Sequence, residues 1–270
     1  MHNEGIQGSL FGSLDDEVIP TAEPDALRVC ALNINNPSRQ RAQTNLNWLL
    51  GTGSNVLVLT EMKASDGSRL IISGLEAEGF DTHLPPGWTD SPYFTLIATR
   101  GFQHLPVTDH FDARAIAVDL LTTDEKTRLV GLYGPTNGMT TESSDRRRAF
   151  QKGFLEYLHS ALQPKLVLAG DLNVIEPSPQ SHLDSFEDHD YAFYTGLQEL
   201  GLTDLFRKLH PTALAHSWLS DRYGSQRLDH VFATTKTGTV INCDYDHAPR
   251  TAQFTDHAAL LTTIALEANA

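Results

Sequence analysis

Four short segments that carry carboxylate or amide side chains each lie where a predicted strand ends. They are Asn33-Ile34-Asn35, Glu61, Gly170-Asp171-Leu172-Asn173, and Asp229 with Asp256-His257. Asp and Asn at a strand end are often only turn formers. Several oxygen-bearing side chains at strand ends, with a histidine beside the last, instead indicate one dispersed site for a hard cation such as Mg²⁺ or Mn²⁺. The sequence has no Cys/His cluster with zinc spacing.

Short apolar runs supply the strands that must position these segments. Residues 27–32, 55–60 and 166–169 are continuous apolar runs, typical of strands buried on both faces, and 228–232 alternates apolar with polar residues. Helices are predicted at 39–50, 68–78, 145–162 and about 191–200, and further strands at 93–99, 115–121, 128–132 and 259–266. Strands outnumber helices, and 115–121 with 128–132 has hairpin spacing. The pattern predicts an α/β fold with mixed sheets.

The composition favours one large domain. The chain has 270 residues, 40% of them hydrophobic, and its motifs extend from end to end. We expect a flexible tail at 1–26, where Gly, Ser, Asp, Glu and Pro occur without periodicity, and one catalytic domain at 27–270. With no long apolar span and no N-terminal signal, we expect a cytoplasmic monomer that does not enter a membrane. Cys30 and Cys243 lie in predicted strands and are expected to be buried thiols.

The charge balance limits how the chain could hold nucleic acid. It has 20 Lys and Arg against 34 Asp and Glu, a net charge of −14 at pH 7. Proteins that hold nucleic acid by charge alone tend to be basic, so any such contact must be local. The candidates for substrate contact are the basic residues near the motifs: Arg39, Arg41, Lys63, Arg222 and Arg227. For the basic stretch 146–152, a solvated helix face and a phosphate contact both remain open.

Six motifs in order resemble those of a known superfamily. They are Leu59-Thr60-Glu61-Met62-Lys63, Tyr133-Gly134-Pro135, Gly170-Asp171-Leu172-Asn173, Ser217-Trp218, Arg227-Leu228-Asp229 and Asp256-His257. Together, over residues 27–266, they resemble the endonuclease/exonuclease/phosphatase superfamily, and within it the exonuclease III type of DNA repair nuclease. The resemblance implies a four-layer sandwich in which two facing mixed β-sheets are flanked by helices, with the site on one edge.

Hydrolysis of a phosphodiester needs a cation, an oriented water and a group that stabilises the departing oxyanion. Glu61 is the first choice for the metal ligand, with Asn35 close by and Asp256 contributing. Asp171 would take the proton from the attacking water while Asn173 orients it, because both leave one strand end on the same face.

The remaining roles concern the phosphate and the leaving group. His257 would contact the scissile phosphate, with its tautomer fixed by the Asp229 carboxylate. Tyr133 and Asn33 would complete the phosphate and leaving-group contacts, although Tyr133 could instead be an aromatic packed at a turn. The resemblance makes Trp218 a wall of a nucleotide pocket, and the alternative is a core residue.

The site, taken with the resemblance, predicts a Mg²⁺-dependent (or Mn²⁺-dependent) phosphodiester hydrolase, and the resemblance implies DNA as its substrate. The resemblance implies a repair nuclease: an abasic-site endonuclease, a 3′–5′ exonuclease or a 3′ phosphatase. The interval from Trp218 to Arg227 is short for an abasic-site endonuclease, which disfavours efficient incision at abasic sites. The alternative is a phosphodiesterase or phosphatase for a small-molecule or lipid phosphate. The intact set of polar residues disfavours a binding module without catalysis.

The predicted tail contains a second resemblance. Gln7-Gly8-Ser9-Leu10-Phe11 resembles the short peptide by which bacterial replication and repair proteins attach to the DNA sliding clamp, with Gly8 in place of the usual Leu. An extended segment could insert Leu10 and Phe11 into a partner's pocket while Gln7 forms hydrogen bonds at its rim. The alternatives are a chance match, or Phe11 packing back on the domain.

Overall fold

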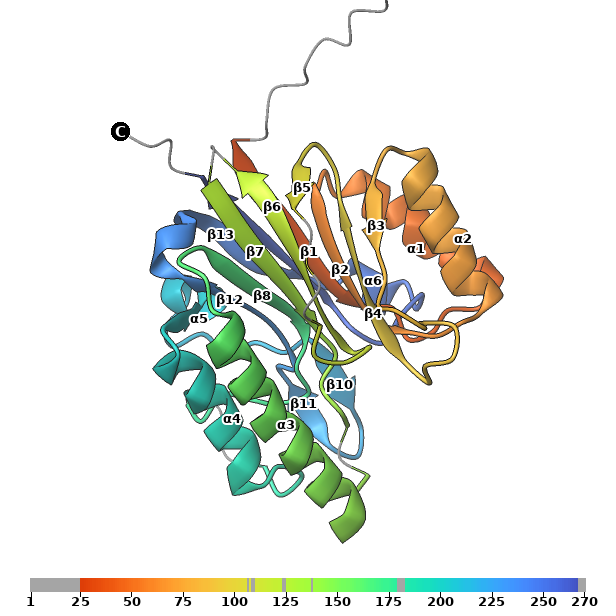
Figure 1. Cartoon of the computed structure of the whole chain (residues 1–270). Coiled ribbons are helices and arrows are strands. Elements are labelled where there is room, and N and C mark those ends of the chain that lie inside the picture. The colour runs from red at the N-terminus through yellow and green to blue at the C-terminus, as the bar shows by residue number, and fades with distance from the viewer. Residues whose placement is uncertain are drawn as a thin grey trace, which may run out of the picture.

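The computed structural model describes residues 25–105, 107, 110–122, 125–136, 138–178 and 183–266, and these residues form two six-stranded β-sheets (Figure 1). The first sheet has the order β13 (Thr239–Asp246), β14 (Ala259–Ala265), β1 (Ala26–Asn33), β2 (Val56–Met62), β4 (Phe94–Thr99), β3 (Asp81–His83). The second has the order β5 (Gln103–Leu105), β6 (Ala115–Thr122), β7 (Glu125–Leu132), β8 (Leu166–Asp171), β12 (Asp229–Thr234), β9 (Leu202–Asp204). Parallel pairing of β1 with β2 and of β7 with β8, among antiparallel neighbours, makes both sheets mixed.

Helices cover the outer face of each sheet. In Figure 1, α1 (Arg39–Gly51) and α2 (Asp66–Ala77) lie beside the first sheet, and α3 (Thr141–Ala161) and α4 (Asp188–Glu199) lie along the second. The short elements are α5 (Leu205–Leu209), the 3₁₀ turn Thr235–Thr237, α6 (Ala248–Thr251), and a hairpin of β10 (Trp218–Ser220) and β11 (Gly224–Gln226). One apolar cluster fills the space between the sheets, and one lies under each helix pair. The four-layer α/β sandwich is therefore confirmed.

Capping residues account for the helix boundaries that the apolar pattern placed too late. Ser38 caps α1 through the amide of Arg41, as its position before the predicted helix suggested. The helix α3 begins at 141, not 145, because the Thr140 hydroxyl accepts from the Ser143 amide. The helix α4 begins at 188, not 191, because Glu187 and Asp190 form a capping box. Polar first turns lack the apolar period from which helices are predicted.

The start of the domain lies one residue before its predicted position. Strand β1 begins at Ala26, and the Leu266 amide donates to the carbonyl of Asp25. The predicted tail, including the peptide Gln7 to Phe11, lies outside the described residues except for its last two positions. Cys30 and Cys243 are buried free thiols, as predicted. Among the described helices, none has both the length and the apolar character needed to cross a membrane.

Candidate active site

The strand ends meet at a cavity of about 260 Å³. It is bordered by the ends of β1, β2 and β8, the start of β12, the β10–β11 hairpin, and the loops before α4 and β14. Its lining residues are Asn33, Glu61, Thr136, Met139, Arg147, Asp171, Asn173, Ser185, Phe186, Trp218, Tyr223, Gln226, Leu228, Asp256 and His257. Segments more than two hundred residues apart in the sequence thus contribute to one concave site.

A β-bulge aims Glu61 at the cavity. The pairing of β2 with β4 shifts register between Leu59 and Met62, and Glu61 has a left-handed backbone with φ 57°. A bulge turns a side chain away from the regular alternation of a strand. The Asn36 amide donates to the Glu61 carbonyl and holds this conformation (3.1 Å). Left-handed backbone is uncommon for a residue other than glycine and concentrates at functional sites.

The Asn33 amide joins the two sheets. Its Nδ2 donates to Glu61 Oε2 (2.9 Å) on the first sheet and to Asp171 Oδ2 (2.8 Å) on the second. Its Oδ1 accepts from the Asn35 amide (2.9 Å), so the side chain has a fixed orientation. Because one amide contacts both carboxylates, Asn33 sets the spacing between the predicted metal ligand and the predicted base.

The end of β8 depends on two glycines. A Cβ on Gly170 would lie 2.2 Å from the Leu132 carbonyl oxygen, and one on Gly134 would lie 2.2 Å from that of Leu172. Only glycine permits so close an approach of β7 and β8. The loop beyond Gly134 and the segment that carries Asp171 are thereby held against each other, where the Gly134 amide donates to the Asp171 carbonyl (2.8 Å).

Asn173 contacts Asp171 for a reason other than the one predicted. Strand β8 ends at Asp171, so the alternation of a strand does not place the two side chains together. Asn173 instead has a left-handed backbone with φ 53°. Its amide donates to Asp171 Oδ1 (3.0 Å), and its Nδ2 donates to Asp171 Oδ2 (3.2 Å) and to the Gly134 carbonyl (2.9 Å). The two residues act as one unit at the strand end.

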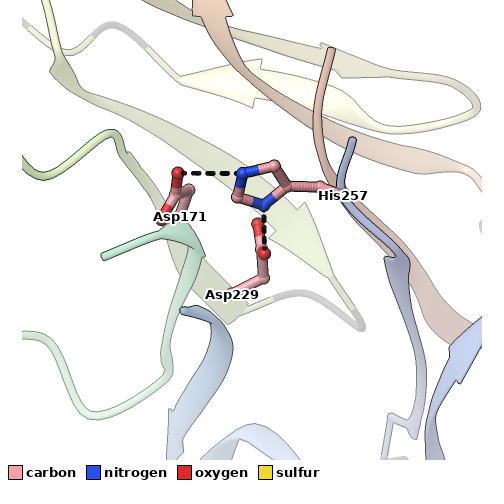
Figure 2. Close-up of side chains that lie close together, drawn as sticks. All are labelled: Asp171, Asp229 and His257. Atoms are coloured by element: carbon pink, nitrogen blue, oxygen red, sulfur yellow. Dashed lines mark hydrogen bonds and ion pairs between the residues drawn. The ribbon is translucent and has the colours of Figure 1, made fainter. Parts of the chain in front are cut away.

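His257 lies between two aspartates (Figure 2). Its Nδ1 is 2.7 Å from Asp229 Oδ2, and its Nε2 is 4.0 Å from Asp171 Oδ2. Burial disfavours a charged imidazole, but the Asp229 carboxylate outweighs burial and raises the pKa of His257 to about 10. With this pKa the ring carries a proton on both nitrogens at neutral pH, and in that state it offers no lone pair to a metal.

The pKa of Asp171 lies close to neutral pH. Burial and, after it, the Asp229 carboxylate raise this pKa, while His257, the Asn33 amide and the Asn173 backbone amide lower it, and the net value is about 7. Three hydrogen-bond donors, from Asn33 and Asn173, point at its two oxygens. A carboxyl group with this pKa can accept and release a proton near neutral pH.

Ser217 fixes the position of Asp229. Its hydroxyl accepts from the amides of Leu228 (3.0 Å) and Asp229 (3.1 Å), and its carbonyl accepts from the Ala258 amide (2.7 Å). Tyr245 donates its phenol proton to the Asp229 carbonyl (2.6 Å). Ser217 thus links the segment of Asp229 with the segment of His257. The Ser217-Trp218 motif was visible in the sequence, but no chemistry there indicated this link.

Asp256 is held between two side chains. Asn35 Nδ2 donates to Asp256 Oδ1 (2.9 Å), and Trp218 Nε1 donates to Asp256 Oδ2 (3.0 Å). Trp218 is half-buried and lines the cavity, so it is a wall of the site and not a core residue. Asn35 reaches the cavity through this contact with Asp256.

Tyr133 is buried close to the carboxylates of Asp171 and Glu61. Burial raises the pKa of its phenol far above the usual range, and the carboxylates of Asp171 and Glu61 raise it further. The phenol is therefore neutral and able to donate a hydrogen bond. Its ring packs edge-on against Tyr93 (5.6 Å between centroids) and under the Arg114 guanidinium (4.7 Å). Both descriptions of Tyr133, a packed aromatic and a polar group near the carboxylates, hold in this structure.

A sequence profile of the Endonuclease/Exonuclease/phosphatase family matches residues 30–257, which is most of the chain. The chain belongs to the endonuclease/exonuclease/phosphatase family. The match extends from β1 to His257 and so includes the strand ends that border the cavity. The resemblance stated from the six motifs is confirmed.

One curated relative and two solved structures are similar to this chain. An exodeoxyribonuclease of Bacillus subtilis (strain 168) is 23% identical over 216 residues, or 74% of this chain and 82% of that protein. The solved structure of an AP endonuclease from Archaeoglobus fulgidus is similar with a TM-score of 0.73 and 20% identity, over 88% of this chain and 99% of that one. A 3′ phosphatase from Neisseria bound to a product DNA hairpin gives a TM-score of 0.72 and 19% identity, over 89% and 99%. At these identities, the two structures support the fold alone.

The basic residues predicted at the substrate have different environments. Arg39 and Arg222 are exposed, and Arg222 lies over the ring of Tyr223, which lines the cavity (5.0 Å). Lys63 is half-buried, with its ammonium 4.3 Å from the Tyr93 ring centroid. Arg41 is half-buried and donates to the carbonyls of Asn35 and Asn36, so it supports the loop after β1. None of the four lines the cavity itself.

The prediction that Arg227 contacts substrate is wrong. Its side chain is 0% exposed and donates to Asp204 (2.7 Å) and to Glu176. Buried guanidinium and carboxylate groups require such partners because desolvation of either charge alone is costly. The same ion pairs explain why Glu176, Asp204 and His230 cluster. This cluster lies inside the protein and supports the segment between Asn173 and Glu176.

The carboxylate and amide oxygens that line the cavity suit coordination of a hard divalent cation. Glu61 is half-buried, and Asn33 contacts only one of its carboxylate oxygens in the described structure. Carboxylate and amide oxygens are the ligands that Mg²⁺ and Mn²⁺ prefer. Asp171, Asp229 and His257 also form a compact cluster, but the doubly protonated imidazole makes that cluster a poorer cation site.

Proposed function

We propose that this chain is a Mg²⁺-dependent phosphodiesterase that acts on DNA in repair, as a 3′–5′ exonuclease, a 3′ phosphatase or an abasic-site endonuclease. The observation that carries the proposal is the arrangement of Asp171 between Asn33 and His257, with His257 paired to Asp229. The names of the similar proteins, an exodeoxyribonuclease, an AP endonuclease and a 3′ phosphatase, support DNA as the substrate. We further propose a cytoplasmic monomer.

The proposed reaction is attack of a water molecule on phosphorus, in which a P–O bond to the water oxygen forms as the P–O bond to the leaving oxygen breaks. Asp171 accepts the proton of this water, and Asn173 orients the water and holds the carboxylate. His257, which is positively charged, faces the phosphate, and Tyr133 donates a hydrogen bond to the phosphate or the leaving group. Both amide protons of Asn33 are donated to Glu61 and Asp171, so Asn33 acts by positioning these carboxylates and not by the phosphate contact predicted for it. Glu61, with Asn35 and Asp256, would hold Mg²⁺, which when bound neutralises negative charge on the phosphate.

The volume of the cavity suits one nucleotide or a terminal phosphate better than a continuous duplex. Its volume is about 260 Å³, and the side chains of Trp218, Phe186 and Tyr223 line it. A nucleotide or a terminal phosphate suits such a cavity. The hairpin β10–β11 has three residues in each strand, in keeping with the short interval that disfavours efficient abasic-site incision. We therefore place action at 3′ ends first.

One observation favours the alternative substrate. The net charge of −14 is unusual for a protein that binds long DNA by charge, so a phosphodiester of a small molecule or a lipid remains the second candidate. The test presents the protein with duplexes that carry a 3′ recess, a 3′ phosphate or an abasic site, and with a single strand. Each is incubated with Mg²⁺, Mn²⁺ or a chelator. Cleavage of a DNA only with metal supports the proposal, and hydrolysis of small phosphodiesters without cleavage of any DNA supports the alternative.

Glu61→Gln is expected to weaken Mg²⁺ binding without disrupting the fold. The amide keeps an oxygen that can accept from Asn33 but loses the charge that attracts a divalent cation. We expect the Mg²⁺ concentration for half-maximal activity to rise at least about tenfold. Titration of activity with Mg²⁺ measures this change, and Glu78→Gln, an exposed glutamate at the end of α2, is the control. An unchanged titration would move the metal ligand to another residue.

We also propose that the segment Gln7 to Phe11 binds the bacterial DNA sliding clamp. Tethering to a clamp on DNA raises the local concentration of substrate, which would offset the net charge of −14. Binding to a purified clamp is compared for the full chain, a chain without residues 1–20, and Leu10→Ala/Phe11→Ala. We expect the full chain to bind and the other two to lose binding. Equal binding by all three, or none by the full chain, contradicts the proposal.

A further inference from the structure

A buried arginine on α3 contacts the backbone of the catalytic segment. Arg147 is 2% exposed and lines the cavity, and its Nη2 donates to the carbonyl of Asn173. Its neighbour Arg146 is exposed and forms an ion pair with Glu142 on the same helix (3.5 Å). The two alternatives for this basic stretch thus separate by residue: Arg146 belongs to a solvated face, and Arg147 belongs to the site.

The charge of Arg147 is already neutralised inside the protein. Its Nε lies 2.7 Å from Asp190 Oδ1, and Asp190 is 0% exposed. Asp190 also accepts from Gln151 Nε2 (2.8 Å) and from the Glu187 amide (3.0 Å). The carboxylate is therefore fixed by α3 and by the start of α4, and in turn it fixes the direction of the guanidinium.

The carbonyl that Arg147 contacts belongs to a residue in an uncommon conformation. Asn173 has φ 53°, which persists only where its surroundings hold it. Two of the three donors that orient the Asp171 carboxylate come from Asn173. A rotation of the Asn173 peptide would therefore displace both the predicted base and the group that orients the water.

We propose that Arg147, held by Asp190, is a positioning residue that fixes the Asn173 backbone and through it the Asp171 carboxylate. The inference rests on the proposed function only in that Asp171 and Asn173 perform the hydrolysis. Because misplacement of reacting groups by about 1 Å can cost about a hundredfold in rate, loss of this contact lowers kcat. Substrate affinity and the Mg²⁺ requirement stay unchanged, since the phosphate and Glu61 contact other groups.

The test uses the neutral pair Arg147→Met/Asp190→Asn, because Arg147→Met alone would leave a buried unpaired carboxylate. Thermal unfolding by circular dichroism establishes that each variant is folded. We expect kcat to fall at least about tenfold, with KM and the half-saturating Mg²⁺ concentration within about twofold of the unmodified chain. Arg146→Met, the exposed neighbour, is the control and retains full activity.

A second variant keeps the test decisive if the neutral pair does not fold. Arg147→Lys retains the charge, but one ammonium group cannot reproduce the forked contacts to Asp190 and the Asn173 carbonyl. We expect a smaller fall in kcat with KM unchanged. The proposal is overturned if folded Arg147→Met/Asp190→Asn or Arg147→Lys retains full kcat. A raised KM at unchanged kcat also overturns it, because that result would make Arg147 a substrate contact.

Two substrates separate this inference from the proposed function. All variants are measured with a 3′-recessed duplex and with bis(p-nitrophenyl) phosphate, which needs no DNA recognition. If the unmodified chain hydrolyses only the small diester, the proposal for DNA fails, while the ratio of kcat values on that diester still tests Arg147. If the unmodified chain cleaves DNA and the Arg147 variants have the same kcat as the unmodified chain on both substrates, the inference fails and the proposed function stands.

Discussion

Replacing Asp171 by Asn is expected to lower kcat at least about a hundredfold while the protein remains folded. The amide has the size of the carboxyl group but cannot accept a proton from water. Asn33 Nδ2 and Asn173 Nδ2 both donate to one oxygen of Asp171, and the Asn173 amide donates to the other. An amide NH₂ group at either position would face a donor, so we also expect local displacement of Asn173.

The measurement is the initial rate of hydrolysis at saturating substrate and Mg²⁺. Thermal unfolding of the same preparation distinguishes loss of chemistry from loss of fold. Asp90→Asn, an exposed aspartate, removes the same charge far from any predicted role and is the control. A kcat for Asp171→Asn close to that of the unmodified chain would remove Asp171 from the reaction.

Asp229→Asn is expected to lower activity at pH 8 about a hundredfold and to move the pH optimum toward acid by about one unit or more. Burial opposes the charge on His257, and Asp229 is the main group that overcomes it and raises the pKa of His257 to about 10. Without this carboxylate, the imidazole loses its second proton at a lower pH. The pKa of Asp171 also falls, because Asp229 is one cause of its rise to about 7.

In Asp229→Asn, the pKa values of Asp171 and His257 are both expected to fall. In the unmodified chain, we expect activity to rise with pH as Asp171 loses its proton near pH 7 and to fall as His257 loses its charge near pH 10. In Asp229→Asn, the rise of activity set by Asp171 and the fall set by His257 should both occur at lower pH. The activity of the variant relative to the unmodified chain should therefore increase as the pH falls. Rates from pH 5 to 10 measure this, with the exposed Asp221→Asn as control. A profile that keeps its position after Asp229→Asn would show that Asp229 does not control the charge of His257.

The sequence predicted the strand ends because buried strands leave a strong signal. Apolar-rich runs of four to six residues are typical of buried strands, and these runs are followed by polar residues that lie at the cavity, as at Asn33 and Asp171. The same apolar pattern does not predict local backbone geometry. The bulge at Glu61 and the left-handed Asn173 depend on pairing and contacts with other segments, and no pattern of neighbouring residues specifies them.

Buried arginines were the main failure. Arg227 belongs to the motif Arg227-Leu228-Asp229, and the sequence does not show its buried role because its partners Glu176 and Asp204 come from distant segments. Arg147 was hidden among three consecutive arginines. One signal was available: Arg147 shares helical spacing with Gln151, Phe154 and Leu158, which all lie on the buried face of α3. An arginine on an apolar helix face needs a buried acceptor, and that requirement points to a site.

The most direct test of the account is one time course of a duplex with a labelled, recessed 3′ strand. The unmodified chain is incubated with Mg²⁺ or with a chelator, and Asp171→Asn is incubated with Mg²⁺. We predict stepwise shortening of the labelled strand in the first reaction and none above background in the other two. Shortening that persists with the chelator, or equal shortening by Asp171→Asn, would contradict a metal-dependent DNA phosphodiesterase centred on Asp171.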